Sequence, residues 1–214
     1  LFAAFSESSQ LAQLASVTVL SIDSGDLEVI REYADSGYIT DATTNPLFVA
    51  QAGMSGDATY SSMVDDAIDY AVSKISADED ATVSLAIDRL AVNLGKAISE
   101  IVPGYISTEV DPRLSFNTEA SVDRALRIIE MYDSLGLSKD RILIKLAATW
   151  EGIQAAEILE KQGIRCNLTL IFSVVQAVAC AQYGAHLISP FPGRILDWHK
   201  NALKRDSVDS PDQD

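Results

Sequence analysis

Residues 142–150 read ILIKLAATW, an aliphatic run that carries a single ammonium group, Lys145. A run of this length and composition is typical of a strand covered on both faces, as in a parallel sheet. A lysine in such a strand has to reach solvent, pair with an acid or perform chemistry, because burying an uncompensated charge is costly. The fold and the role of Lys145 are therefore one question.

Similar runs of β-branched and aliphatic residues recur on both sides of this stretch. Together they predict strands over 17–23, 38–44, 104–110, 141–147, 166–172 and 186–191. Helices are predicted between them, several ending at a glycine, over 27–35, 59–75, 80–101, 118–135, 150–162 and 174–183. Strands that alternate with helices in this way form a parallel sheet.

One long helix, over 80–101, shows how its packing face is predicted. Its apolar residues recur at helical spacing and are expected to face the sheet: Val83, Ile87, Leu90, Leu94, Ile98 and Ile101. The two-glycine stretch GMSGD at 53–57 is interpreted as a loop rather than a phosphate cradle.

Two architectures contain such alternation, an open doubly wound sheet and a (β/α)8 barrel. An open sheet gathers its site at one switch point, whereas a barrel brings the carboxyl ends of all its strands to one mouth. Every predicted strand has a polar residue in it or just after it, namely Asp23, Asn45, Glu109, Lys145, Asn167, Thr169 and Ser189. This distribution favours an α/β fold of the (β/α)8 TIM barrel type, as a single domain over 1–214.

In a barrel, Lys145 lies between the outer helices and the packed lumen. Burial disfavours the charged form of an amine, and an unprotonated amine is a nucleophile. A lysine that extends its head to the rim, or that pairs with a carboxylate such as Glu109, is the structural alternative. From the residues alone both interpretations stay open, although carboxylates, amides and hydroxyls on neighbouring strands favour carbonyl chemistry.

The charge balance argues against two classes of partner. The chain has 16 basic and 31 acidic residues and a formal net charge of −15, which repels nucleic acid and anionic membranes. A small anionic substrate stays compatible, because screening over about 8 Å lets a local arginine or helix N-terminus outweigh distant charges.

Further features bear on location. Cys166 and Cys180 are too few for a disulfide framework, fit a reducing compartment and are expected to be small core residues. Residues 1–10 lack the basic start of a signal peptide. The uncharged stretch 167–193 has the length of a membrane span, but its polar residues and Gly184 divide it into strand, helix and strand.

Five ordered motifs resemble the transaldolase family, class I aldolase-like enzymes of the pentose phosphate pathway. They are TDATTNP (40–46), ISTEVDPRLSF (106–116), RILIKLAATWEGIQAAE (141–157), CNLTLIFS (166–173) and LISPFPGRILDW (187–198). The resemblance covers about residues 23–198. It implies a transferase that moves a dihydroxyacetone unit from sedoheptulose 7-phosphate or fructose 6-phosphate to an aldose phosphate through a lysine Schiff base.

The resemblance also implies catalytic roles. Lys145 matches the lysine that forms the Schiff base, and Asp23 matches the general acid and base that takes the proton of the C4 hydroxyl. Glu109 and Thr169 match the pair that holds a water for proton transfer during imine formation.

Substrate-binding roles follow from the same motifs. Asn45 and Asn167 match amides that hold the dihydroxyacetone hydroxyls, with Ser189 beside them, although Asn45 also fits a purely structural turn before Pro46. Arg194 matches a phosphate-binding arginine, and a surface pair with Asp197 is its structural alternative. Phe191 stands where similar fructose 6-phosphate aldolases carry a tyrosine. It lacks a hydroxyl to help release the enamine, which favours transfer over simple cleavage.

The C-terminal region departs from the family pattern. The resemblance implies two further βα units, one with a second phosphate-binding arginine, whereas residues 200–214 (KNALKRDSVDSPDQD) are polar and predict a loop. We therefore expect a barrel that is incomplete at its C-terminus, its C-terminal strands missing from this chain. Such a chain would expose unpaired first and last strands and have little or no activity alone.

Two other functions stay open: a Schiff-base fructose 6-phosphate aldolase that releases dihydroxyacetone, and a non-catalytic sugar-phosphate-binding fragment. No metal and no cofactor are expected, since His186 and His199 lie on no recognisable ligand spacing. The expected partners are sugar phosphates and a second copy of the chain in a homodimer. The expected location is the cytoplasm, with the plastid as the alternative.

Overall fold

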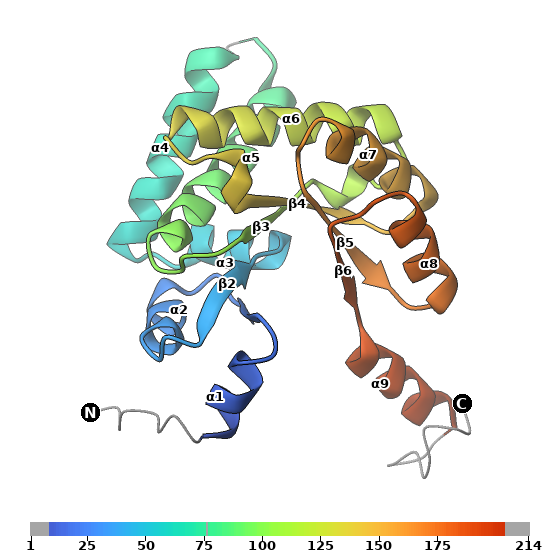
Figure 1. Cartoon of the computed structure of the whole chain (residues 1–214). Helices are drawn as coiled ribbons and strands as arrows, with labels where there is room; N and C mark the ends of the chain where they lie inside the picture. Colours follow the sequence, from blue (N-terminus) through green and yellow to red (C-terminus); the bar gives the residue numbers. More distant parts are fainter. Residues whose placement is uncertain (1–8, 76, 204–214) are drawn as a thin grey trace.

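One parallel sheet organises the computed structural model, which describes residues 9–75 and 77–203 (Figure 1). The described strands follow the order β1-β2-β3-β4-β5-β6, so each lies beside its neighbour in the chain. Their bounds are β1 (Leu20–Asp23), β2 (Ile39–Thr43), β3 (Ile106–Glu109), β4 (Ile142–Ala147), β5 (Cys166–Ile171) and β6 (Leu187–Pro190). All six predicted strands are confirmed. Sequential parallel order is the arrangement of a (β/α) barrel rather than of a doubly wound sheet.

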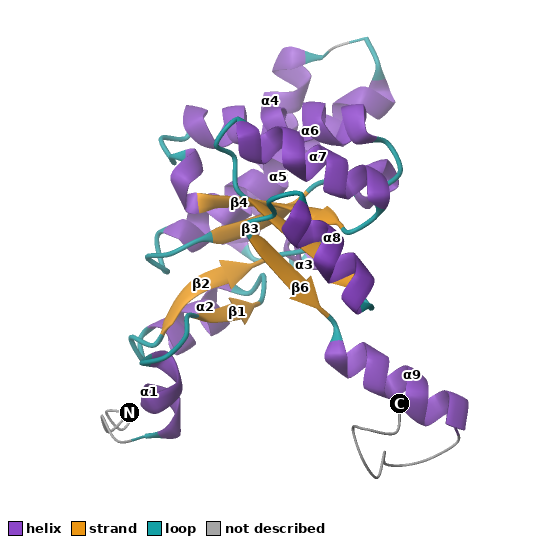
Figure 2. Ribbon diagram, turned by 45° about the vertical axis from the view of Figure 1, so that its right-hand side comes forward, coloured by secondary structure: helices purple, strands orange, loops and turns teal. Residues whose placement is uncertain are grey.

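Helices lie along the outer side of the curved sheet, as Figures 1 and 2 show. Those predicted from the sequence are α2 (Leu27–Ala34), α4 (Ala58–Lys74), α5 (Glu79–Ser99), α6 (Thr118–Ser134), α7 (Trp150–Lys161) and α8 (Val174–Gln182). Short 3₁₀ turns precede α6 and β4, at η1 (Pro112–Leu114) and η2 (Lys139–Arg141). In the described part of the chain, β1 and β6 each pair with one strand only, so the sheet is an open part of a barrel.

The strands present alternate residues to two different environments. Ile106, Ile144 and Leu168 point to the helices and are completely buried in one core cluster with Leu94 and Ile98 of α5. The intervening residues face the inner side of the sheet, where Ser107, Leu143 and Asn167 line a cavity of about 410 Å³. The inner side therefore carries the polar residues and the outer side carries the core.

Capping side chains and glycines set the helix bounds, and the glycines stand at the helix ends as the sequence predicted. Asn117 accepts a hydrogen bond from the Ala120 amide at the start of α6, and Ser173 does the same for Gln176 at α8. Gly136 and Gly163 follow α6 and α7 with φ of 73° and 72°, a left-handed conformation that favours glycine.

The structure corrects the predicted face of α5. Leu94 and Ile98 are fully buried, but Val83 and Ile87 are about half exposed. The N-terminal half of the helix packs on α4 and α6 rather than on the sheet. The buried positions from 85 to 92 are therefore Leu85, Asp88, Arg89, Ala91 and Val92.

No bounds were predicted for three described helices, α1 (Gln10–Ala15), α3 (Pro46–Met54) and α9 (Pro192–Leu203), although His199 of α9 was expected on a helix. The sequence predicted a loop over 200–214 and over 53–57, but 200–203 are the last turn of α9 and 53–54 end α3. Residues 1–8 and 204–214 lie outside the described residues, so what the sequence predicts there stays a prediction.

Candidate active site

Three predicted site residues lie side by side on the central strands. The register pairs Glu109 of β3 with Lys145 of β4, and Lys145 with Asn167 of β5. Neighbours in register on one face of a sheet have side chains within contact distance. The sheet therefore brings together a carboxylate, an amine and an amide from three successive strands.

Lys145 is buried, with 7% of its surface exposed. Its Nζ donates to the main-chain oxygen of Thr44 at 3.2 Å and forms an ion pair with Glu109 Oε2 at 3.4 Å. The pairing that the sequence left open as a structural alternative is thus present. It does not exclude chemistry, because a base next to a nucleophile is also how proton transfer is arranged.

Glu109 has a perturbed ionisation. Burial raises the pKa of its carboxyl, the positive charge of Lys145 and its hydrogen bond lower it, and the negative charge of Asp23 raises it further. Asp23 ends β1, in register with Thr43 of β2, and is exposed. Glu109 is therefore the carboxylate that contacts the amine, and Asp23 acts on Glu109 through its charge.

Asn167 is held between two serines. Its Nδ2 donates to Ser107 Oγ at 3.2 Å, and its Oδ1 accepts from Ser189 Oγ at 2.7 Å. Only 2% of Asn167 is exposed. Ser189 thus lies beside Asn167, where the sequence predicted it.

Thr169 is the next inward residue of β5 and pairs in register with Ala147. Its buried hydroxyl has no hydrogen-bond partner among the described residues, a state shared with the hydroxyl of Thr43. Buried polar atoms are rarely left without a partner, so a hydroxyl of this kind fits a bound water or substrate.

Asn45 has a structural role. Its side-chain oxygen accepts from the amides of Leu47 and Phe48, at 2.9 and 3.1 Å, and so caps α3 ahead of Pro46. The cap occupies the oxygen and leaves the amide nitrogen, and Asn45 lines a cavity that Glu109 also lines. A cap and a binding role are compatible here.

Phe191 and Arg194 lie beyond β6. The Phe191 ring packs edge-on against Phe172 at 5.6 Å, and its amide donates to Ile171 O. Arg194 is exposed on α9, which extends away from the central strands (Figure 1). Among the described residues, Arg194 makes no ion pair with Asp197 and no hydrogen bond to another predicted site residue.

Two residues at the site were missed from the sequence. Thr44 supplies the main-chain oxygen to Lys145, and Ser107 supports Asn167. Ser107 had a signal, since it is a polar residue two positions before Glu109 and so on the same face of β3. Thr44 had none, because it acts through its backbone.

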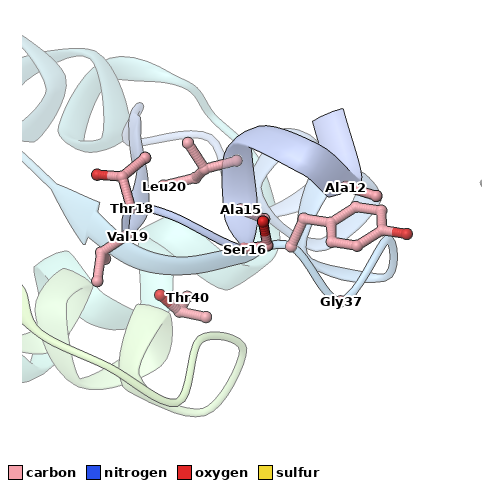
Figure 3. Close-up of a pocket in the computed structure, with 9 residues that line it drawn as sticks. Ala12, Ala15, Ser16, Thr18, Val19, Leu20, Gly37 and Thr40 are labelled. Carbon is pink, nitrogen blue, oxygen red and sulfur yellow. The ribbon is translucent and has the colours of Figure 1, made fainter. Parts of the chain in front are cut away.

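Thr44 and Glu109, the two residues that contact the amine, line a cavity of about 580 Å³. It is mostly apolar, between α3 and α5, with Asp88 and the Asp111–Arg113 ion pair at its edge. A separate hollow of about 390 Å³ lies between α1 and the starts of β1 and β2 (Figure 3). It is lined mainly by small side chains such as Ala12, Ala15 and Ser16, and it contains none of the predicted site residues.

Asp88, at the edge of the larger cavity, forms a buried ion pair with Arg124, with Nη1 2.6 Å from Oδ2. Burial raises the pKa of Asp88 to about 6, although Arg124 and Arg127 lower it. A raised folded-state pKa gives stability that is present at low pH and lost as pH rises through that pKa.

We therefore expect the wild-type chain to lose more stability between about pH 4 and pH 7 than Asp88→Asn does. The extra loss is on the order of 3 kcal/mol. Urea denaturation gives the free energy of unfolding of both chains across this pH range. Groups that titrate in the same way in both chains cancel in the difference. Parallel pH profiles for the two chains would contradict the prediction.

Neither a metal cluster nor a membrane span is found in the described residues. No group of three or more His, Cys, Asp and Glu residues in 9–75 and 77–203 is placed to hold a metal ion. None of the described helices is long and apolar enough to cross a bilayer.

A curved parallel sheet that brings a carboxylate, an amine and an amide together on adjacent strands is an arrangement that a (β/α) barrel provides. The comparison with protein families makes this specific. Residues 20–214 match the family described as transaldolase/fructose-6-phosphate aldolase. The chain belongs to this family.

Curated relatives agree. The chain is 52% identical over 95% of its length to a transaldolase of Actinobacillus pleuropneumoniae serotype 3. It is 51% identical over 97% of its length to one of Alteromonas mediterranea, and 53% over 95% to one of Aeromonas salmonicida. In each case the match covers 62% of the relative, so the chain spans about three fifths of the length of these proteins.

Proposed function

We propose that the site performs the transaldolase reaction, transferring a dihydroxyacetone unit from a ketose phosphate to an aldose phosphate through a Schiff base on Lys145. The observation that carries the proposal is the buried Lys145 amine, held between Glu109 and the Thr44 carbonyl, with Asn167 in register beside it. Membership of the family and relatives named transaldolase support the same reaction.

In the proposed first stage, the neutral amine of Lys145 adds to C2 of fructose 6-phosphate or sedoheptulose 7-phosphate. The C2 oxygen takes up protons and leaves as water, and an iminium forms. Glu109, with a raised pKa, is suited to pass protons through a water at the Thr169 hydroxyl. This assigns the unpartnered hydroxyl of Thr169 a function.

In the second stage, Asp23 removes the proton of the C4 hydroxyl. The C3–C4 bond then breaks, its electrons move into the iminium, and an aldose phosphate leaves. A three-carbon enamine stays on Lys145 until a second aldose phosphate accepts it by the reverse steps. Asn45, Asn167 and Ser189 are assigned to the hydroxyls of the three-carbon unit.

Specificity is assigned to the end of the sheet that carries β6 and α9. Phe191 offers no hydroxyl to protonate the enamine, which favours transfer over release of dihydroxyacetone. Arg194 is assigned to the phosphate, for which the planar, multiply donating guanidinium is suited. The pathway proposed is the pentose phosphate pathway. The proposed location is the cytoplasm, which the two free, buried cysteines support.

Reductive trapping tests the proposal. This chain, and a version extended to close the barrel, are each mixed with fructose 6-phosphate and borohydride, because the chain alone is expected to have little or no activity. The modified lysine is found by peptide mass spectrometry. We expect a reduced three-carbon adduct on Lys145 of the extended version, because cleavage precedes reduction. No adduct on either, or one on another lysine, would refute the imine reaction.

Addition of an acceptor aldose phosphate separates the remaining alternatives. Transfer predicts that the acceptor is extended by three carbons while little free dihydroxyacetone forms. An aldolase predicts free dihydroxyacetone that is independent of the acceptor. Binding of fructose 6-phosphate without any adduct would favour a non-catalytic sugar-phosphate-binding role.

A further inference from the structure

The amine of Lys145 has two fixed neighbours, and one of them is a main-chain carbonyl. Nζ donates to Thr44 O at 3.2 Å, and Glu109 Oε2 is 3.4 Å away. Thr44 is 101 positions before Lys145 in sequence and follows the last residue of β2. The carbonyl is neutral, so its contribution is directional rather than ionic.

The Thr44 carbonyl is held in place by its own residue. The Thr44 amide and the Thr44 hydroxyl both donate to the main-chain oxygen of Ser107, at 3.1 and 3.0 Å. Thr44 is 1% exposed. On its other side Asn45 is extended, as a residue before proline has to be, and caps α3. Hydrogen bonds therefore fix Thr44 to β3 while the next residue starts a helix.

Two acceptors determine where a neutral amine directs its lone pair. A neutral lysine nitrogen carries two hydrogens and one lone pair around a tetrahedral centre. When Thr44 O and Glu109 take the two hydrogens, the lone pair is left to point in the one remaining direction. A substrate carbonyl has to approach along that direction for attack.

We propose that Thr44 is a positioning residue, whose hydroxyl fixes the carbonyl that orients the Lys145 amine for attack. The inference rests on the proposed imine reaction and adds to it a residue that touches no substrate atom. Without the hydroxyl, one of the two bonds to Ser107 O is lost, and the carbonyl is free to tilt. The amine then turns toward Glu109 and is held as an ion pair.

The first test uses Thr44→Val, which keeps the shape of the side chain and removes its hydroxyl. We expect the maximal rate of trapping with fructose 6-phosphate to fall about tenfold, the equivalent of one hydrogen bond. The half-saturating concentration should stay within about twofold, because Thr44 contacts the amine and not the sugar. Thr44→Ser keeps the hydroxyl and should restore the rate.

A matched control is Thr82→Val. The Thr82 hydroxyl also donates to main-chain oxygens, those of Asp78 and Ile75, but in the first turn of α5. It should leave the trapping rate unchanged. An equal fall in Thr82→Val and Thr44→Val would show general loosening and overturn the proposal, as would a Thr44→Ser chain as slow as Thr44→Val.

A second measurement does not depend on ketose chemistry. Pulse acetylation with acetic anhydride, mapped by mass spectrometry, reports the reactivity of the Lys145 amine relative to that of Lys139. We expect this ratio to fall about tenfold in Thr44→Val and to recover in Thr44→Ser. If wild type forms no ketose adduct, the proposed function fails, and acetylation still decides the role of Thr44. A ratio within twofold of wild type in Thr44→Val would overturn that role.

Discussion

A Lys145→Met chain is expected to give no reduced three-carbon adduct with fructose 6-phosphate, a fall of at least about 10³-fold. Methionine fills the same channel with a flexible, unbranched side chain but has no amine. The other groups at the site cannot form an imine, so they offer no replacement route. Trapping and peptide mass spectrometry measure the loss.

The same substitution should also change how stability depends on pH. Glu109 keeps its burial but loses the positive charge that lowers its pKa, so that pKa rises further above its ordinary range. A raised folded-state pKa means that stability is present at low pH and lost as pH rises. Lys145→Met is therefore expected to be most destabilised at alkaline pH, by up to about 3 kcal/mol, and least in acid.

Lys161→Met is the control, since Lys161 is exposed and, among the described residues, its ion pair is with Glu157 one helical turn away. It should keep both the adduct and the stability of wild type, because an exposed ion pair contributes little. A three-carbon adduct that persisted in Lys145→Met at the wild-type yield would disprove the assignment of the nucleophile.

The central strands were predictable because their sequences show which residues face the outer core and which face the inner side of the sheet. ILIKLA alternates residues for the outer core with Leu143 and Lys145 for the inner side, and six such runs in alternation with helices leave few topologies. The register then places Glu109 beside Lys145, which the sequence could suggest only as a possible pair. The exposure of Val83 and Ile87 was not predictable, because helical spacing gives an apolar face but not which neighbour covers it.

The contacts that orient the amine were hidden for a different reason. The hydrogen bond from Lys145 to Thr44 ends on a backbone oxygen, which every residue type has. Only the backbone conformation places that oxygen beside the amine, so the residue type at position 44 gives no signal. The sequence supported two interpretations of Asn45, a structural turn and a binding role. The structure shows that Asn45 caps α3, and the binding role stays a proposal. Arg194 was assigned from the resemblance, and in the described structure it lies on α9 without a contact to the central residues.

Gly152→Ala is expected to be strongly destabilising. Gly152 is the third residue of α7, and a Cβ there would lie 2.0 Å from the main-chain oxygen of Ala147 and 3.0 Å from Thr149 Oγ1. Ala147 ends β4, two residues after Lys145, and Thr149 caps α7 by accepting from the Gly152 amide at 2.9 Å. The clash is with backbone, so it can be relieved only by moving the helix away from the strand.

We expect Gly152→Ala to lose at least about 4 kcal/mol of unfolding free energy, since overpacking against backbone exceeds the usual cost of an added methyl group. Gly193→Ala is the matched control, because Gly193 is also near the start of a helix, α9, but a Cβ there meets nothing within 4 Å. That change should be neutral or stabilising by up to about 1 kcal/mol, through helix propensity. Urea denaturation compares the two chains, and a Gly152→Ala chain as stable as Gly193→Ala would show that α7 does not need this close approach to β4.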